Sequence, residues 1–206
     1  MHAMRIRRIP ALLGAALVAW SAASCDNPAG SRQVRESELV FVRATADAPP
    51  LDSLVVHVWA KAGENRQATI RYQKRGGYGG DICLEFKIPG NGLWRRPDGT
   101  LVAKGDSVLL TITVVDPALF NFRFEPAGLQ FHPDHPAELR VSYKWADPDF
   151  NGDGKVDSRD EDFDFGFWRQ EKDGGDWFEL GTVKDFDLEE LRADIRGFTK
   201  YAMAGA

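Results

Sequence analysis

Apolar and polar side chains alternate along most of the chain after Leu39, and this pattern limits the protein to half-buried strands. The alternating runs span residues 54–58, 68–72, 82–88, 108–114, 120–124, 139–143 and 191–195, followed by Phe198, Tyr201 and Met203. Successive side chains of a strand point to opposite faces, so each run has one face to bury against another sheet. The pattern predicts an all-β, antiparallel β-sandwich.

Glycine and proline residues between the runs leave little room for helices. They stand at Gly76, Gly77, Gly79, Gly80, Pro89, Gly90, Pro97, Pro117, Pro126, Pro133 and Pro136. Two short helices are expected. One begins at Asp187, with Leu188 and Leu191 spaced for one face, and the other comes just after the acidic segment described next.

The segment from Asp149 to Asp160 has the length and spacing of a twelve-residue calcium loop. The expected ligands are the side chains of Asp149, Asn151 and Asp153, the carbonyl of Lys155, Asp157 directly or through water, and a bidentate Asp160. Gly154 takes the turn position, and Val156 is expected to pack the loop onto its domain. These hard oxygens predict Ca²⁺, whereas Mg²⁺ prefers a smaller octahedral cage that retains waters.

The loop resembles that of a dockerin, because aspartate closes it and an alternating run precedes it where calcium sensors have a helix. This resemblance implies a structural staple and not a switch. A dockerin has two such loops and this chain has one, so docking to a cohesin is not expected. Residues 147–164 contain eight carboxylates and only two positive side chains, Lys155 and Arg159. We therefore expect charge repulsion to loosen the segment when no cation is bound. The alternative is a solvated acidic insert that only resembles the motif.

The N-terminus has the layout of a secretory signal peptide over residues 1–24. Three arginines precede an apolar run at 11–20, and small residues at 21–24 precede Cys25. The run is shorter than the roughly 20 residues of a membrane-spanning helix. Small residues before a cysteine resemble the bacterial lipobox, although Ala22 replaces the usual leucine. The resemblance implies a diacylglycerol on Cys25 and a lipid anchor in a bacterial membrane.

Two alternatives for this region stay open. Ordinary signal-peptidase cleavage near Ala23 or Ser24 would release a soluble secreted protein. Without lipidation, Cys25 could also pair with Cys83, which otherwise is a structural thiol on a strand. Residues 25–37 have the composition of a tether, and about twelve such residues span on the order of 20 Å.

Three short motifs between residues 81 and 204 resemble the ZU-type β-sandwich of zonula occludens proteins, ankyrins and netrin receptors. They are Lys87–Leu93 with its Ile-Pro-Gly turn, Phe124–Phe131, and Gly197–Ala202. The resemblance implies a sandwich over residues 81–204, with the segment 147–164 as an insert, within a β-sandwich domain expected over residues 38–206. The strands before Tyr72 either extend the same sandwich or form a small packed annex. Some relatives cut themselves at the Phe-Ser bond of a His-Phe-Ser segment. Here Gly197 and Thr199 flank Phe198, which makes the Phe198–Thr199 bond the place for such a cut.

Other candidate sites have ordinary structural interpretations. His132 and His135 lie in a proline-flanked turn and His57 lies on a strand, so neither suggests a catalytic base or a metal pair. The tryptophans at 145, 168 and 177 suggest core filling, with an aromatic platform for sugar rings as the alternative. A net charge of -5 and a pI near 5.4 disfavour nucleic acid as a partner.

Together these features predict a non-enzymatic, exported lipoprotein of the cell envelope. Its calcium-stabilised β-sandwich would serve as an interaction or structural module, with an envelope protein or a glycan as partner. A secreted carbohydrate-binding module is the alternative, and an autoproteolytic domain cutting at Phe198–Thr199 is the third.

Overall fold

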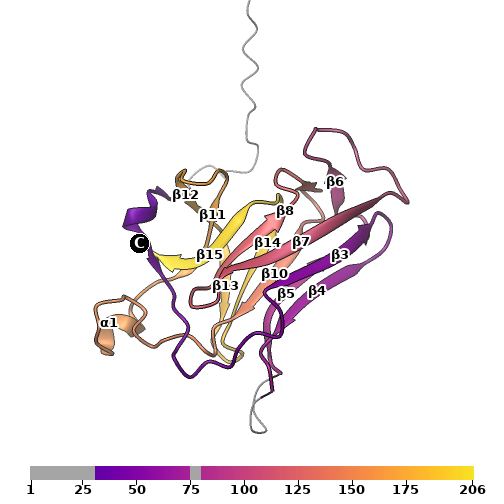
Figure 1. Ribbon diagram of the computed structural model, residues 1–206. Helices are drawn as coiled ribbons and strands as arrows, with labels where there is room; N and C mark the ends of the chain where they lie inside the picture. Colours follow the sequence, from indigo (N-terminus) through magenta and orange to yellow (C-terminus); the bar gives the residue numbers. More distant parts are fainter. Residues whose placement is uncertain (1–30, 75–79) are drawn as a thin grey trace, which may run out of the picture.

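The alternating runs form strands whose apolar faces meet between two antiparallel sheets (Figure 1). The computed structural model describes residues 31–74 and 80–206. The fold is an all-β sandwich, as predicted. The signal peptide and Cys25 lie outside the described residues.

The larger sheet contains eight strands that come from both ends of the sequence. Its order is β1 (Gln33–Val34), β12 (Trp177–Glu179), β11 (Gly166–Gln170), β15 (Lys200–Gly205), β8 (Asn121–Glu125), β7 (Ser107–Asp116) and β3 (Val55–Lys61), and β2 (Val40–Phe41) also pairs with β15. The two-residue strands β1 and β2 therefore join the N-terminal segment to the last strands of the chain.

The smaller sheet contains five strands and faces the larger one across the core. Its order is β13 (Thr182–Asp185), β14 (Glu190–Ile195), β10 (Ala137–Ser142), β5 (Ile82–Ile88) and β4 (Arg66–Arg71). A separate pair joins β6 (Leu93–Arg95) to β9 (Gln130–Phe131). The helical segments of the described residues are the 3₁₀ turn η1 (Glu36–Glu38) and α1 (Ser158–Glu161).

Aromatic rings from both sheets fill the middle of the core. Phe124 lies 5.2 Å from Phe86 and 5.3 Å from both Phe198 and Tyr201, measured between ring centroids. All four side chains are buried. Edge-to-face and tilted contacts of this kind stabilise a core beyond the area that they bury.

A second cluster covers the outer face of the larger sheet beneath the N-terminal segment. Trp168 and Trp177 are buried there with Leu39, and Trp168 Nε1 donates to the Ala204 carbonyl at 2.8 Å. Trp177 Nε1 donates to Glu36 Oε2 at 3.1 Å. These two tryptophans are therefore core residues and cannot form a platform for sugar rings.

The prediction of a helix that begins at Asp187 is wrong. Residues 186–189 form the turn between β13 and β14, and Leu191 is a buried strand residue that alternates with Ala193 and Ile195. Leu188 is 61% exposed, so it does not share a buried face with Leu191. The period-two pattern prevails because β14 pairs with β10 in the smaller sheet, which turns one complete face of β14 into the core between the sheets.

Cys83 lies on β5 with its thiol buried beside Tyr72. Burial raises the pKa of this thiol to about 11, and it also raises the pKa of the Tyr72 hydroxyl. Both groups therefore stay neutral at physiological pH, as expected for a structural thiol.

Candidate metal centre

The acidic segment forms one of the connections between the two sheets. It leaves the smaller sheet after β10 and enters the larger sheet at β11, and α1 lies within it at the lower left of Figure 1. The short helix expected after the loop is therefore present, although it begins at Ser158, inside the twelve residues. A cation bound here would hold a link between the two layers.

The first half of the loop is organised by the carboxylate of Asp149. Its Oδ1 accepts from the Asp153 N–H at 3.1 Å, and its Oδ2 accepts from the Gly154 N–H at 2.9 Å. Gly154 has a φ of 84°, which a residue with a side chain rarely adopts. The expected first ligand thus folds the chain around the expected turn position.

The second half is organised by Asp160, the expected closing ligand. Its Oδ1 accepts from the Asn151 N–H at 3.1 Å and its Oδ2 accepts from the Asp157 N–H at 2.9 Å. The residue is only 5% exposed, and within residues 31–74 and 80–206 it is the one buried carboxylate. Asp157 in turn caps α1 by accepting from the Arg159 N–H at 2.9 Å. The third, ninth and twelfth loop positions are thereby brought together.

Arg159 connects two further expected ligands. Its Nη2 lies 2.9 Å from Asp153 Oδ2 and 2.7 Å from Asp157 Oδ2. The hydrogen bond from this guanidinium lowers the pKa of the Asp157 carboxyl, and the same bond raises the pKa of Arg159. Asp153 Oδ1 accepts from the Lys155 N–H at 3.0 Å, so both oxygens of Asp153 have partners within the loop.

The donor set fits calcium by its chemistry, because the predicted ligands are all hard oxygens. Each carboxylate oxygen has about two lone pairs, so the backbone hydrogen bonds of Asp149 and Asp160 leave acceptor capacity. Across the described residues, however, no group of three or more His, Cys, Asp or Glu side chains is already gathered around one point. Asp153 and Asp157 are instead turned toward Arg159.

The expected role of Val156 is wrong, since its side chain is 65% exposed. Phe150 anchors the loop instead. Its ring stacks on Phe165 with centroids 4.7 Å apart and planes 13° apart. Phe163 packs against Gly205 at the end of β15. Sequence reasoning missed Phe150 because position 2 of the loop binds no metal, although a large aromatic inside an acidic loop was a signal of anchoring.

The N-terminal segment also holds the loop. The Asp147 N–H donates to the Arg43 carbonyl at 2.8 Å, and the Thr45 N–H donates to the Trp145 carbonyl at 2.9 Å. At Gly152, a Cβ would lie 3.2 Å from Val40 Cγ1 of β2. The loop and the residues that flank it therefore contact β2, the residues after β2 and the last strand.

Comparison of the chain with protein-family models, with curated proteins and with solved structures finds no match. The ZU-type and dockerin-like resemblances therefore stay predictions. In the described part of the chain, no helix is long and apolar enough to cross a membrane.

The two histidines at the proline-flanked turn pair with their own loop. The rings of His132 and His135 lie 5.3 Å apart, and Nδ1 of His132 accepts from the Asp134 N–H at 3.2 Å. The His135 N–H donates to the His132 carbonyl at 2.9 Å. These contacts stabilise a tight turn.

The Phe198–Thr199 bond lies between the core and β15. Phe198 is 3% exposed, and the Thr199 hydroxyl donates to the Gln170 carbonyl on the neighbouring strand β11. A nucleophilic hydroxyl needs a nearby base to take its proton. Here the hydrogen bond of the hydroxyl serves to join two strands.

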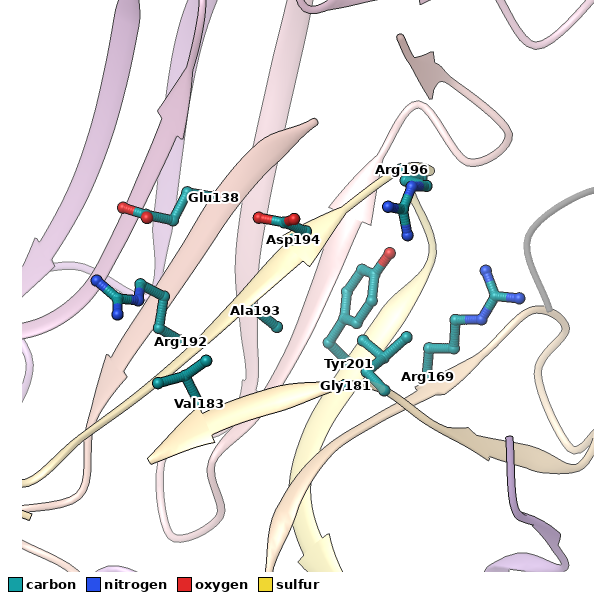
Figure 2. Close-up of a pocket in the computed structure, with 10 residues that line it drawn as sticks. Glu138, Arg169, Gly181, Val183, Arg192, Ala193, Asp194, Arg196 and Tyr201 are labelled. Atoms are coloured by element: carbon teal, nitrogen blue, oxygen red, sulfur yellow. The ribbon is translucent and has the colours of Figure 1, made fainter. Parts of the chain in front are cut away.

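A polar cavity of about 320 Å³ lies beside β14 (Figure 2). It is lined by Glu138, Arg169, Leu180, Gly181, Val183, Arg192, Ala193, Asp194, Arg196 and Tyr201. Three arginines against two carboxylates leave a surplus of one positive charge, which disfavours a metal cation. Arg169 forms an ion pair with Glu171 at 3.2 Å, and Glu138 pairs with Arg140 at 2.6 Å. Ion pairs with neighbouring residues thus engage two of the five charged side chains that line this cavity.

Proposed function

We propose that this protein is a non-enzymatic lipoprotein of the bacterial cell envelope, in which calcium holds an all-β sandwich in shape for contacts with other envelope components. The burial of Asp160 carries this proposal. A carboxylate is rarely buried unless a cation or several hydrogen bonds compensate its charge. Asp160 has two backbone donors and occupies the closing position of a calcium motif.

The position of the loop in the fold favours a structural calcium site over one that drives a conformational change. A calcium switch needs an element with two alternative arrangements. Here the loop joins β10 to β11, and aromatic stacking at Phe150 fixes it to the core. Calcium would bind the native loop and stabilise the fold without moving a helix.

The proposed location in the cell envelope rests on the signal-peptide layout and on Cys25. A tether would lead from the lipid to β1, which begins at Gln33 and pairs with β12, so the tether expected over residues 25–37 is too long at its C-terminal end. Metabolic labelling with a radioactive fatty acid tests this address. Label in the wild type that is lost in Cys25→Ser supports the anchor, and an unlabelled protein in the medium supports the soluble alternative.

The partner we propose is a protein of the envelope. A glycan is the second candidate, and one residue favours it. Trp59 is 61% exposed on the outer face of β3, beside Leu109 of β7, which is 42% exposed. The neighbouring His57 and Thr111 offer polar groups, with Nδ1 of His57 2.9 Å from Thr111 Oγ1. Quenching of fluorescence by soluble glycans in the wild type, lost in Trp59→Ala, would favour this module.

Autoproteolysis is the third candidate. Intact mass spectrometry of the purified protein tests it directly. One fragment that ends at Phe198 and one that begins at Thr199 would support the cut, whereas a single uncut mass rules it out.

Thermal unfolding in chelator and across a calcium titration tests the main proposal. Binding to the native state alone raises stability by about 2.7 kcal/mol when calcium reaches a hundred times its dissociation constant. The double variant Asp149→Ala, Asp160→Ala should lose this rise. Magnesium at the same concentration should raise the stability of the wild type by less than calcium does. If calcium stabilises neither protein, the loop is only a solvated insert.

A further inference from the structure

We propose that Arg159 is a built-in counter-cation of the acidic loop, which occupies Asp153 and Asp157 in the absence of metal and competes with calcium for them. This inference rests on the calcium site proposed above. It deepens that proposal by naming the residue that sets the affinity.

The geometry places the guanidinium between two predicted ligands. One nitrogen, Nη2, reaches Asp153 at 2.9 Å and Asp157 at 2.7 Å, which are the fifth and ninth positions of the loop. The Nε of Arg159 adds a bond of 3.1 Å to Asp157 Oδ1. A planar guanidinium suits such bridging, because its donors lie in a fixed fork that matches carboxylate oxygens.

Charge explains why the loop needs this contact. The twelve residues contain four carboxylates, at positions 149, 153, 157 and 160, and two cations, Lys155 and Arg159. Among the residues that the structure describes, the side chain of Lys155 takes part in no ion pair or hydrogen bond, and only its backbone N–H donates, to Asp153. Arg159 is therefore the cation that offsets repulsion within the loop. The sequence predicts that charge repulsion loosens this loop, and the guanidinium contacts oppose that repulsion.

Arg159 is also easy to displace. Its side chain is 61% exposed, so the guanidinium can move into water without opening the core. Calcium prefers six to eight oxygens, and it must take Asp153 and Asp157 from the guanidinium to complete its shell. Each exposed ion pair resists this exchange only weakly. Removal of Arg159 should therefore strengthen calcium binding and should weaken the metal-free loop.

Calorimetric titration of calcium into the purified protein tests this competition, with Arg159→Gln beside the matched control Lys155→Gln. Both changes remove one positive charge from the loop, but only the first removes a contact with the ligands. We expect Arg159→Gln to lower the dissociation constant about 2- to 10-fold more than Lys155→Gln does. Equal dissociation constants for the two variants would overturn the inference while leaving the calcium site intact.

A second measurement needs no calcium. In chelator, hydrogen exchange at the amides of residues 149–160 should be faster in Arg159→Gln than in the wild type or in Lys155→Gln. Unchanged exchange would also overturn the inference. If calcium binds neither the wild type nor the variants, the proposed calcium function fails and the competition fails with it. That outcome differs from equal dissociation constants for the two variants, because in that case calcium still binds all three proteins.

Discussion

Replacement of Asp160 by alanine should destabilise this protein more than any other single change in the acidic loop. The side chain is 5% exposed and accepts hydrogen bonds from the N–H groups of Asn151 and Asp157. Alanine would leave both donors without their acceptor in the segment that joins β10 to β11.

The size of the effect follows from these two bonds. Asn151 is half-buried and Asp157 is exposed, so water replaces part of each lost bond, and at about 0.5–1.5 kcal/mol per bond the two give about 1–3 kcal/mol in chelator. For a chain of this length, each kcal/mol shifts the melting temperature by about 2–4 °C. With calcium at a hundred times its dissociation constant, the wild type should gain about 2.7 kcal/mol more and Asp160→Ala should gain none.

The assay is thermal unfolding followed by circular dichroism, in chelator and in calcium. Asp162→Ala is the matched control, because it removes the same charge from an exposed residue at the end of α1. Surface changes of this kind usually stay within about 0.5 kcal/mol. If the two variants unfold at the same temperature in chelator, the burial of Asp160 does not stabilise the fold.

Three other features of the fold give further predictions. Gly205→Ala should cost about 1–3 kcal/mol of stability in urea unfolding, because a Cβ would meet the loop backbone at 2.6 Å, whereas Gly181→Ala has free space and should not. Burial raises the pKa of Cys83 from 9.0 to about 11, so its contribution to stability is present below pH 9 and is lost as the pH rises from about 9 to 11. Iodoacetamide at pH 8 should therefore label Cys83 only in the unfolded protein, and rapid labelling of the native protein would contradict its burial. Trp59→Phe should remove much of the fluorescence that iodide quenches, whereas Trp168→Phe should remove almost none, because the two side chains are 61% and 1% exposed.

The sequence predicted the strands well because burial of one face leaves a period of two. The run 82–88 became β5, and the run 191–195 became β14. The positions of the loop residues that fold the chain were also predictable. Asp149 binds the turn amide of Gly154, and Asp160 closes the loop. These features are local, so short-range spacing contains them.

The parts that could not be predicted depend on contacts between distant segments. Trp177 is buried because the N-terminal segment crosses over it, and its partner Glu36 lies 141 residues away. Val156 was expected to pack the loop onto its domain because it is apolar and occupies position 8, yet its side chain is exposed. Competition between Arg159 and the metal needed side-chain geometry, since spacing alone does not say which cation meets which carboxylate.

The acidic loop has a larger structural role than its own twelve residues suggest. Strands β1 and β2 have two residues each, too few to hold the N-terminal segment by backbone pairing alone. The loop contacts this segment at Val40, and the residues that flank the loop contact Arg43 on one side and Gly205 of β15 on the other. On the proposed anchor at Cys25, any pull from the membrane enters the domain through β1 and η1, immediately before these contacts. A cation that stiffens the loop would therefore reinforce the place where the tether joins the sandwich.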